Sequence, residues 1–158
     1  MNLLVFVLSF SFMEFVAYTN HKYIMHGFLW KWHKDHHVND HKKLKNGDEI
    51  VEKRFELNDL FFIVYATPAI VSLLIGYTIN SHLMISIGLG ISLYGFIYFI
   101  IHDVIIHKRL KIPFLQNSKN FYIKAILKAH DAHHHGKNKK DFSNYGLLIF
   151  QLRFLKKY

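Results

Sequence analysis

The sequence contains no cysteine. Without thiols, the chain has no disulfide framework, no thiolate zinc site, no iron–sulfur cluster and no cysteine nucleophile. Any bound metal must therefore have nitrogen or oxygen ligands. The sequence also lacks a glycine fingerprint for a flavin or nicotinamide cofactor, so a redox reaction would need electrons from another protein.

Charged residues are nearly absent from three long stretches. Residues 1–19 carry one charge, Glu14, and lack a cleavage site of the signal-peptidase type, so we expect an anchor rather than a removable signal peptide. Residues 60–79 and 82–101 contain no Asp, Glu, Lys or Arg, and only two residues separate them. Together the three stretches predict membrane helices in a single domain, residues 1–158, with the second and third forming a hairpin.

The basic residues predict the orientation of these helices. Three crossings place residues 20–59 and all residues from 102 onward on the same side, and every Lys and Arg falls on that side. The positive-inside rule makes it the cytoplasm. The net charge of +9 does not indicate a nucleic-acid interface, because the basic residues lie in short stretches between apolar runs. A fourth crossing fits only residues 142–155, which are few and include Gln151 and Arg153, so we expect an interfacial segment there.

Histidines are concentrated on the predicted cytoplasmic side. Twelve of the thirteen lie there, and ten of them form four short clusters. Two clusters are pairs separated by four residues, and two are triplets in which two residues separate the first histidine from an adjacent pair. The clusters are His21 and His26; His33, His36 and His37; His102 and His107; and His130, His133 and His134.

The cluster spacing indicates a metal site. On an α-helix the members of a triplet project from one face, whereas the members of a pair point about 140° apart and would flank a site. One continuous helix from His21 would present His26, His33 and His37 as a stripe. Because a pair followed by a triplet occurs once before the hairpin and once after it, the sequence predicts two metal ions. Imidazole suits iron, zinc, copper or nickel, so these ligands alone do not name the ion.

Acidic residues inside and near the clusters are candidates for a supporting role. Asp35, Asp103 and Asp131 each lie within a cluster, where a carboxylate can accept a hydrogen bond from a ligand histidine and offset the charge of the metal. Glu14, seven residues before His21, is a candidate for orienting that histidine. The alternative for each is an ordinary surface or interfacial carboxylate.

The clusters and their surroundings resemble the bacterial beta-carotene 3-hydroxylases, within the fatty acid hydroxylase and sterol desaturase superfamily of membrane non-haem di-iron enzymes. The resemblance spans about residues 14–148 and rests on HKYIMHGFLWKWHKDHH, FELNDLFFIVYATPAI, YGFIYFIIHDVIIHKR and KAHDAHHHGKN. It implies an all-α membrane bundle with a cytoplasmic, histidine-rich cap that holds two iron ions. All ten clustered histidines are the ligands that it implies, although the extra His135 leaves the choice between His134 and His135 open.

The resemblance also implies a reaction. Oxygen from O₂ would be inserted at C3 of the β-ionone ring, converting beta-carotene to beta-cryptoxanthin and then zeaxanthin, with electrons from ferredoxin or a reductase, in a bacterial inner membrane. We expect an aromatic wall to hold the polyene and a basic surface to attract an acidic electron donor. The wall comprises Tyr94, Phe96, Tyr98 and Phe99, and the surface Lys42, Lys43, Lys108, Arg109, Lys137, Lys139 and Lys140.

Two other functions fit parts of the pattern. A sterol, fatty acyl or other lipid hydroxylase or desaturase of the same superfamily would carry the same histidine clusters. A membrane protein that binds or transports metal without catalysis is less consistent with the sequence, because the predicted membrane helices are nearly free of polar groups.

Overall fold

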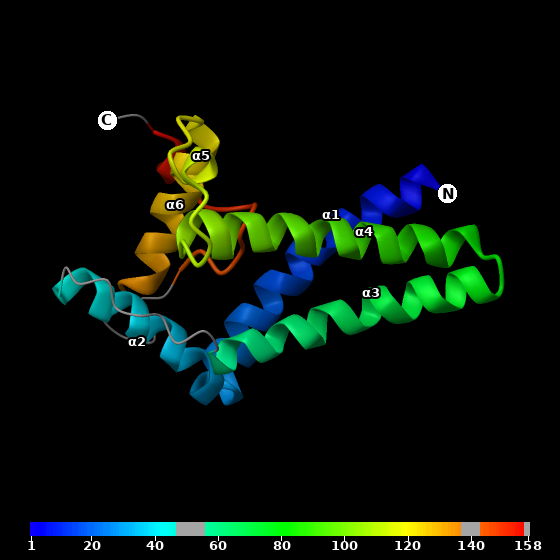
Figure 1. Cartoon of the computed structure of the whole chain (residues 1–158), viewed down its shortest axis with the longest axis horizontal. Helices are drawn as coiled ribbons and strands as arrows, with labels where there is room; N and C mark the ends of the chain where they lie inside the picture. The colour runs from blue at the N-terminus through cyan, green and yellow to red at the C-terminus, as the bar shows by residue number, and fades with distance from the viewer. Residues whose placement is uncertain (47–55, 137–142, 157–158) are drawn as a thin grey trace.

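The fold is a helical membrane hairpin crossed by a third helix, with a cap of further helices at one end (Figure 1). The computed structural model describes residues 1–46, 56–136 and 143–156, and the side chains among them except residues 39–46. Every regular element in these ranges is a helix, which confirms the all-α prediction. The elements are α1 (Leu3–Thr19), η1 (Asn20–Phe28), α2 (Trp30–Asn46), η2 (Leu57–Asp59), α3 (Leu60–Thr78), α4 (His82–Phe99), η3 (Ile100–Ile106), α5 (Pro113–Gln116), α6 (Phe121–His134) and η4 (Leu152–Leu155).

Three helical segments are long and apolar enough to cross a membrane. They comprise Leu3–Phe28, Leu57–Thr78 and His82–Ile106, in agreement with the three stretches predicted from the sequence. The first and third extend beyond the predicted ends because each continues as a π-helix, η1 after α1 and η3 after α4.

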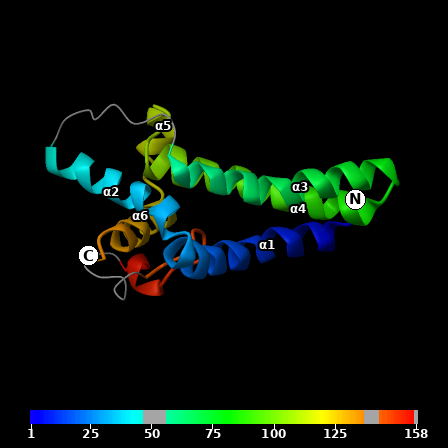
Figure 2. The same cartoon turned by 90° about the horizontal axis from the view of Figure 1, so that it is seen from below.

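Small residues let the long helices approach one another closely. A Cβ atom added at Gly90 of α4 would lie 2.6 Å from the carbonyl oxygen of Phe6 in α1, and one added at Gly88 would lie 2.6 Å from Leu73 of α3. Helix α4 is therefore the central helix, and α1 and α3 pack on it from different sides (Figure 2).

The cap lies at the end of the molecule opposite the α3–α4 turn and the N-terminus (Figure 1). Helices α2, α5 and α6 gather there. After α6, residues 143–151 contain no helix and return to the end of the bundle, where Leu147 packs with Ile101 and Ile126. No fourth candidate membrane span is found among the described residues.

Candidate metal centre

Both histidine pairs are placed by π-helices: His21 and His26 lie on η1, and His102 lies on η3, which His107 caps at its C-terminal end. The amide of His107 donates to the carbonyl of His102 at 2.9 Å, and the amide of Leu29 donates to Ile24 at 3.0 Å; both bonds join residues five apart. Residues five apart then lie on the same face, which an α-helix does not allow. Accordingly, the rings of His21 and His26 are 5.1 Å apart and those of His102 and His107 are 4.5 Å apart. The expectation that each pair would flank a site from widely separated directions is wrong.

The predicted continuous helix from His21 is also wrong. Gly27 has non-helical backbone angles (φ −97°, ψ −119°), and the chain changes direction there between η1 and α2. The histidines nonetheless converge, because the break directs α2 back across the end of the bundle. The rings of His26 and His33 lie 4.9 Å apart.

Five histidines form the first group, which we call group A. The group comprises His21, His26, His33, His37 and His133, with one ligand atom from each lying within 4.8 Å of all the others. The Nε2 atom of His33 is 3.0 Å from that of His21 and 3.0 Å from that of His37. The Nε2 atoms of His26 and His133 are also 3.0 Å apart.

Four histidines form a second group, group B. They are His36, His102, His107 and His130, all buried and with ligand atoms within the same 4.8 Å limit. The Nε2 atoms of His107 and His130 lie 3.1 Å apart. Nε2 of His36 is buried and has no hydrogen-bond partner among the residues the structure describes. A buried polar atom of this kind is costly unless something binds it, which favours a metal ion in the group.

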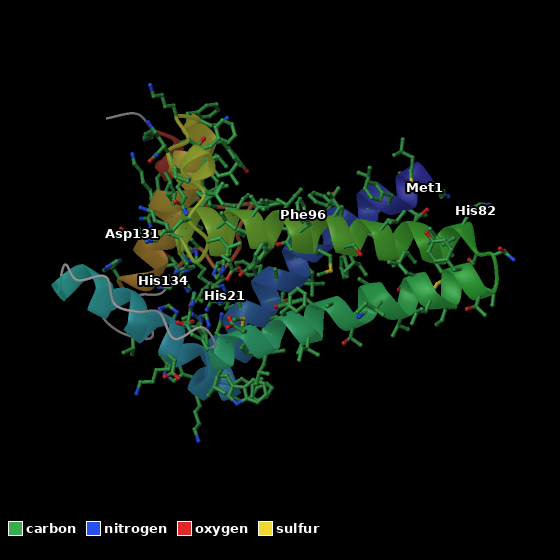
Figure 3. The ribbon with its side chains drawn as sticks, in the orientation of Figure 1. Met1, His21, His82, Phe96, Asp131 and His134 are labelled. Atoms are coloured by element: carbon green, nitrogen blue, oxygen red, sulfur yellow. The ribbon has the colours of Figure 1, made fainter. Side chains whose placement is uncertain are left out.

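His134 lies between the two groups, whereas His135 lies outside them. The ring of His134 is buried, 4.3 Å from His37 in group A and 4.5 Å from His130 in group B. His135 is exposed, and its Nδ1 donates to the carbonyl of Asp131. The geometry therefore favours His134 in the choice that the sequence left open. Figure 3 shows His134 and His21 at the capped end and His82 at the far end of the hairpin.

Neutral oxygen atoms orient three histidines of group A. Nδ1 of His21 donates to the Tyr145 carbonyl at 2.9 Å, Nδ1 of His33 to Oδ1 of Asn58 at 2.7 Å, and Nδ1 of His133 to the Ser143 carbonyl at 2.8 Å. A neutral imidazole with its proton on Nδ1 presents a lone pair at Nε2.

The resulting arrangement fits a cation. His21 and His33 both have the Nδ1 proton held by oxygen, so their Nε2 lone pairs face each other at 3.0 Å and repel one another unless a positive charge lies between them. Two nitrogens bound at right angles to one ion, each at about 2.1 Å, are themselves about 3.0 Å apart. The distances within group A match this spacing.

Carboxylates orient two histidines of group B. Nδ1 of His36 faces Glu56 at 3.2 Å, and Nδ1 of His102 faces Asp103 at 3.3 Å. Arg109 joins the two carboxylates, at 2.9 Å from Glu56 and 3.3 Å from Asp103, and also contacts Asp59 at 2.5 Å. Three carboxylates and one guanidinium give a net charge of −2 beside group B, which offsets part of the charge that metal ions would bring.

Two of the three predicted acidic residues lie elsewhere. Asp103 contacts a clustered histidine, as expected. Asp35 is exposed, because it is two positions from both His33 and His37 and therefore about 200° around the helix from each. The side chain of Asp131 is 72% exposed and contacts His135.

Sequence reasoning missed three residues that support the centre. Asn58 and Glu56 appeared only within the quoted stretch FELNDLFFIVYATPAI, and Arg109 was assigned to a basic docking surface rather than to the centre. Asn58 and Glu56 have no helical spacing relation to His33 and His36, because η2 reaches these histidines across the fold. Arg109 acts through carboxylates rather than by contact with a histidine. The only signal in the sequence was their position: Glu56 and Asn58 precede a membrane helix, and Arg109 follows a histidine pair.

Burial favours the neutral form of four histidines in the cap. It lowers the pKa of His33 and of His133 to about 3, with neighbouring histidines adding to the effect. Burial likewise lowers the pKa of His36 and of His130 well below the ordinary value. Neutral imidazole is the form that binds a metal ion.

The four predicted wall residues do not share one face. Phe96 and Phe99 are exposed on α4, which in a membrane places them against lipid. Figure 3 labels Phe96 on this helix. Tyr94 is buried and donates to Glu14, and Tyr98 stacks on His102 with ring centroids 5.0 Å apart. The tyrosines thus belong to the interior of the bundle rather than to a wall shared with the phenylalanines.

Comparisons with known proteins identify a family and several relatives of this chain. The sequence model of a family described as fatty acid hydroxylase matches residues 6–152. The chain is 35% identical to a beta-carotene hydroxylase of Pseudescherichia vulneris, over 93% of this chain and 76% of that protein. It is 36% identical to a beta-carotene hydroxylase of Pantoea ananas, over 92% and 75%. It is also 36% identical to a chloroplastic beta-carotene 3-hydroxylase 2 of Arabidopsis thaliana, over 80% and 39%. No solved structure matches.

Proposed function

This chain belongs to the fatty acid hydroxylase family, and we propose that it hydroxylates a carotenoid at C3 of the β-ionone ring. One observation carries the choice of substrate: identity of 35–36% to bacterial proteins named beta-carotene hydroxylase over more than nine tenths of this chain. It is an oxidoreductase that converts beta-carotene to beta-cryptoxanthin and then zeaxanthin.

Groups A and B hold one iron ion each. Group A supplies His21, His26, His33, His37 and His133, group B supplies His36, His102, His107 and His130, and His134 lies between them. When bound, two iron ions supply the activation of O₂ that no amino-acid side chain provides.

The protein's own residues prepare this centre in two ways. The oxygen atoms of Tyr145, Asn58 and Ser143 hold the protons of three imidazoles on Nδ1, so that each Nε2 faces the group. Burial removes water from around the rings and keeps them unprotonated. Little rearrangement of the ligands is then needed when metal binds.

The position of the centre suits a substrate dissolved in the bilayer. The histidine pairs continue directly from two membrane helices, α1 and α4, so the metal groups lie where the apolar part of the bundle ends. A carotenoid has a hydrocarbon chain for which the bilayer is the natural solvent. The ring of such a substrate would approach the centre from the lipid side.

Two further parts of the proposal concern the surroundings. The capped end faces the cytoplasm of a bacterial inner membrane, because crossings by residues 1–19, 60–79 and 82–101 leave all Lys and Arg residues in the sequence segments on that side. The two electrons come from a ferredoxin or a reductase, drawn to this basic side. Of the predicted docking residues, Lys108 and Arg109 are described, whereas the side chains of the other five lie outside the described residues. Arg109 is committed to the carboxylates near group B.

A fatty acyl or sterol substrate is the second candidate, because the matching family is described as fatty acid hydroxylase. Expression in cells that accumulate beta-carotene separates the two. We expect conversion to cryptoxanthin and zeaxanthin, identified by chromatography, and none with His33→Ala. Unchanged pigment, alongside a related enzyme that is active in the same cells, would refute carotenoid hydroxylation.

A further inference from the structure

A buried carboxylate lies in the first membrane helix. Glu14 is only 6% exposed and accepts three hydrogen bonds. Oε1 accepts from the amides of Leu147 and Ile149, both at 2.9 Å, and Oε2 accepts from the hydroxyl of Tyr94 at 2.6 Å. A carboxylate in a membrane helix is costly and is usually retained for function.

These bonds fix the position of the segment that follows α6. Two of its amides bind one oxygen atom of Glu14, and Gly146 lies directly against that atom. A Cβ atom added at Gly146 would be 2.6 Å from Oε1 of Glu14 and 2.7 Å from the carbonyl oxygen of Ile149. Any larger residue would therefore displace the segment from Glu14.

The same segment holds two histidines of group A. Its carbonyl groups at Ser143 and Tyr145 accept the Nδ1 protons of His133 and His21. The ring of Tyr145 also packs edge-on against both histidines, with ring centroids 5.2 Å from His133 and 5.6 Å from His21.

We propose that Glu14 is a positioning residue for group A, acting through residues 143–149 rather than by contact with a histidine. It anchors the amides of this segment, and the segment's carbonyls set the direction in which His21 and His133 present Nε2. The sequence suggested that Glu14 orients His21; the structure supplies an indirect route and adds His133. This proposal rests on the proposed function only in assuming that group A binds a metal ion.

The role of Glu14 is that of an acceptor, not of a negative charge. All three of its partners are neutral donors. A glutamine at this position keeps one oxygen for the two amides, and its NH₂ group can donate to the Tyr94 hydroxyl, which is able to accept. Glu14→Gln should thus preserve the segment, whereas Glu14→Ala leaves the two amides without their acceptor.

The test measures metal bound per chain in purified protein in lipid nanodiscs, loaded with Fe²⁺ without oxygen and then dialysed against a weak chelator. We expect two ions in the unchanged protein and in Glu14→Gln. We expect one ion in Glu14→Ala and in Gly146→Ala, with affinity at the emptied group weakened roughly 10–100-fold. Ser86→Ala is the matched control: it removes a buried hydroxyl from α4 near the far end of the hairpin and should retain both ions.

Double variants identify which group has lost its ion. When His36→Ala is combined with Glu14→Ala, the remaining ion should be lost, because His36 is a ligand in group B. His33→Ala, in group A, should leave that ion in place. The reverse pattern would overturn the assignment to group A.

Three other results would overturn the proposal. Retention of both ions with unchanged affinity in Glu14→Ala would refute a positioning role, and loss in Glu14→Gln equal to that in Glu14→Ala would refute the acceptor role. If Glu14→Ala does not fold, the test uses Gly146→Ala instead, and two tightly held ions in Gly146→Ala would refute the positioning role. Metal binding is measured without substrate, so failure of carotenoid conversion in the unchanged protein would contradict the proposed function alone.

Discussion

Arg109 offers the sharpest test of how group B is supported. Its guanidinium lies among three carboxylates, at 2.9 Å from Glu56, 2.5 Å from Asp59 and 3.3 Å from Asp103. Two of these carboxylates face the Nδ1 atoms of group B histidines. Arg109→Leu puts an apolar side chain at this position. It removes the guanidinium that, among the described residues, contacts the carboxylates of both the His36–Glu56 and the His102–Asp103 pair.

The size of the effect follows from burial and distance. At an effective dielectric constant of about 20, two unit charges about 4 Å apart interact by about 4 kcal/mol. Part of this is offset because leucine does not have to be desolvated as an ion. Removing one partner of a buried ion pair costs about 3–5 kcal/mol. Because the side chain of Arg109 is 24% exposed, we take the lower end, about 3 kcal/mol of folding stability.

The metal content should change as well. Without Arg109, three carboxylates repel one another, and Glu56 and Asp103 lose the contact that holds them against their histidines. We expect the affinity of group B for metal to fall roughly 10–100-fold while group A keeps its ion. Arg109→Lys restores the charge but not the forked contact, so it should be intermediate.

Metal analysis and thermal unfolding of purified protein measure both effects. Lys119→Leu, which removes one exposed positive charge, is the matched control and should change neither. Two tightly bound ions and an unchanged melting temperature in Arg109→Leu would refute the reasoning.

Three further predictions concern the cap. His134→Ala should weaken metal binding by more than the roughly 10–100-fold typical of supporting residues, whereas His135→Ala should leave metal content and turnover unchanged. Equal losses in the two variants would contradict the choice of His134 over His135 as a ligand. Because burial lowers the pKa of His33 and His133 to about 3, the folded metal-free protein binds fewer protons than the unfolded chain between pH 6.5 and 3. The free energy of unfolding of the metal-free protein should therefore be constant above pH 6.5 and fall below that pH by about 1.4 kcal/mol per pH unit for each such histidine. Denaturant titrations at pH 7 and pH 5 measure this difference, and equal free energies at the two pH values would contradict the prediction. Reduction by an acidic ferredoxin should slow as ionic strength rises, and a salt-insensitive rate would remove the basic side from the docking surface.

The long apolar runs made the membrane helices predictable. A stretch of about 20 residues without charge has few alternatives in a membrane protein, so the approximate helix limits and the hairpin follow from composition alone. Histidine spacing likewise predicted which residues gather at one end, and the structure brings all ten clustered histidines together there.

The supports of the centre were less predictable because they depend on contacts between distant parts of the chain. Asn58 reaches His33 across 25 residues, and Glu14 binds amides more than 130 residues away. No periodicity relates such residues, so only the folded chain reveals them. Asp35 and Asp131 illustrate the converse, since proximity in sequence to a histidine cluster did not place them near the metal groups.

The two histidine spacings are best understood together through the local helix period. In the triplets, histidines four apart stack along an α-helix, as His33 and His37 do at 4.7 Å. In the pairs, histidines five apart achieve similar separations, 5.1 and 4.5 Å, only because the backbone adds one residue to the turn. Both π-helices begin where an apolar helix ends, which is where the chain must turn its polar side chains inward rather than toward lipid. The spacing of four intervening residues in each pair is thus typical of a π-helix as well as of a metal site. The prediction of an α-helix at these positions therefore gave the wrong directions for the two rings of each pair.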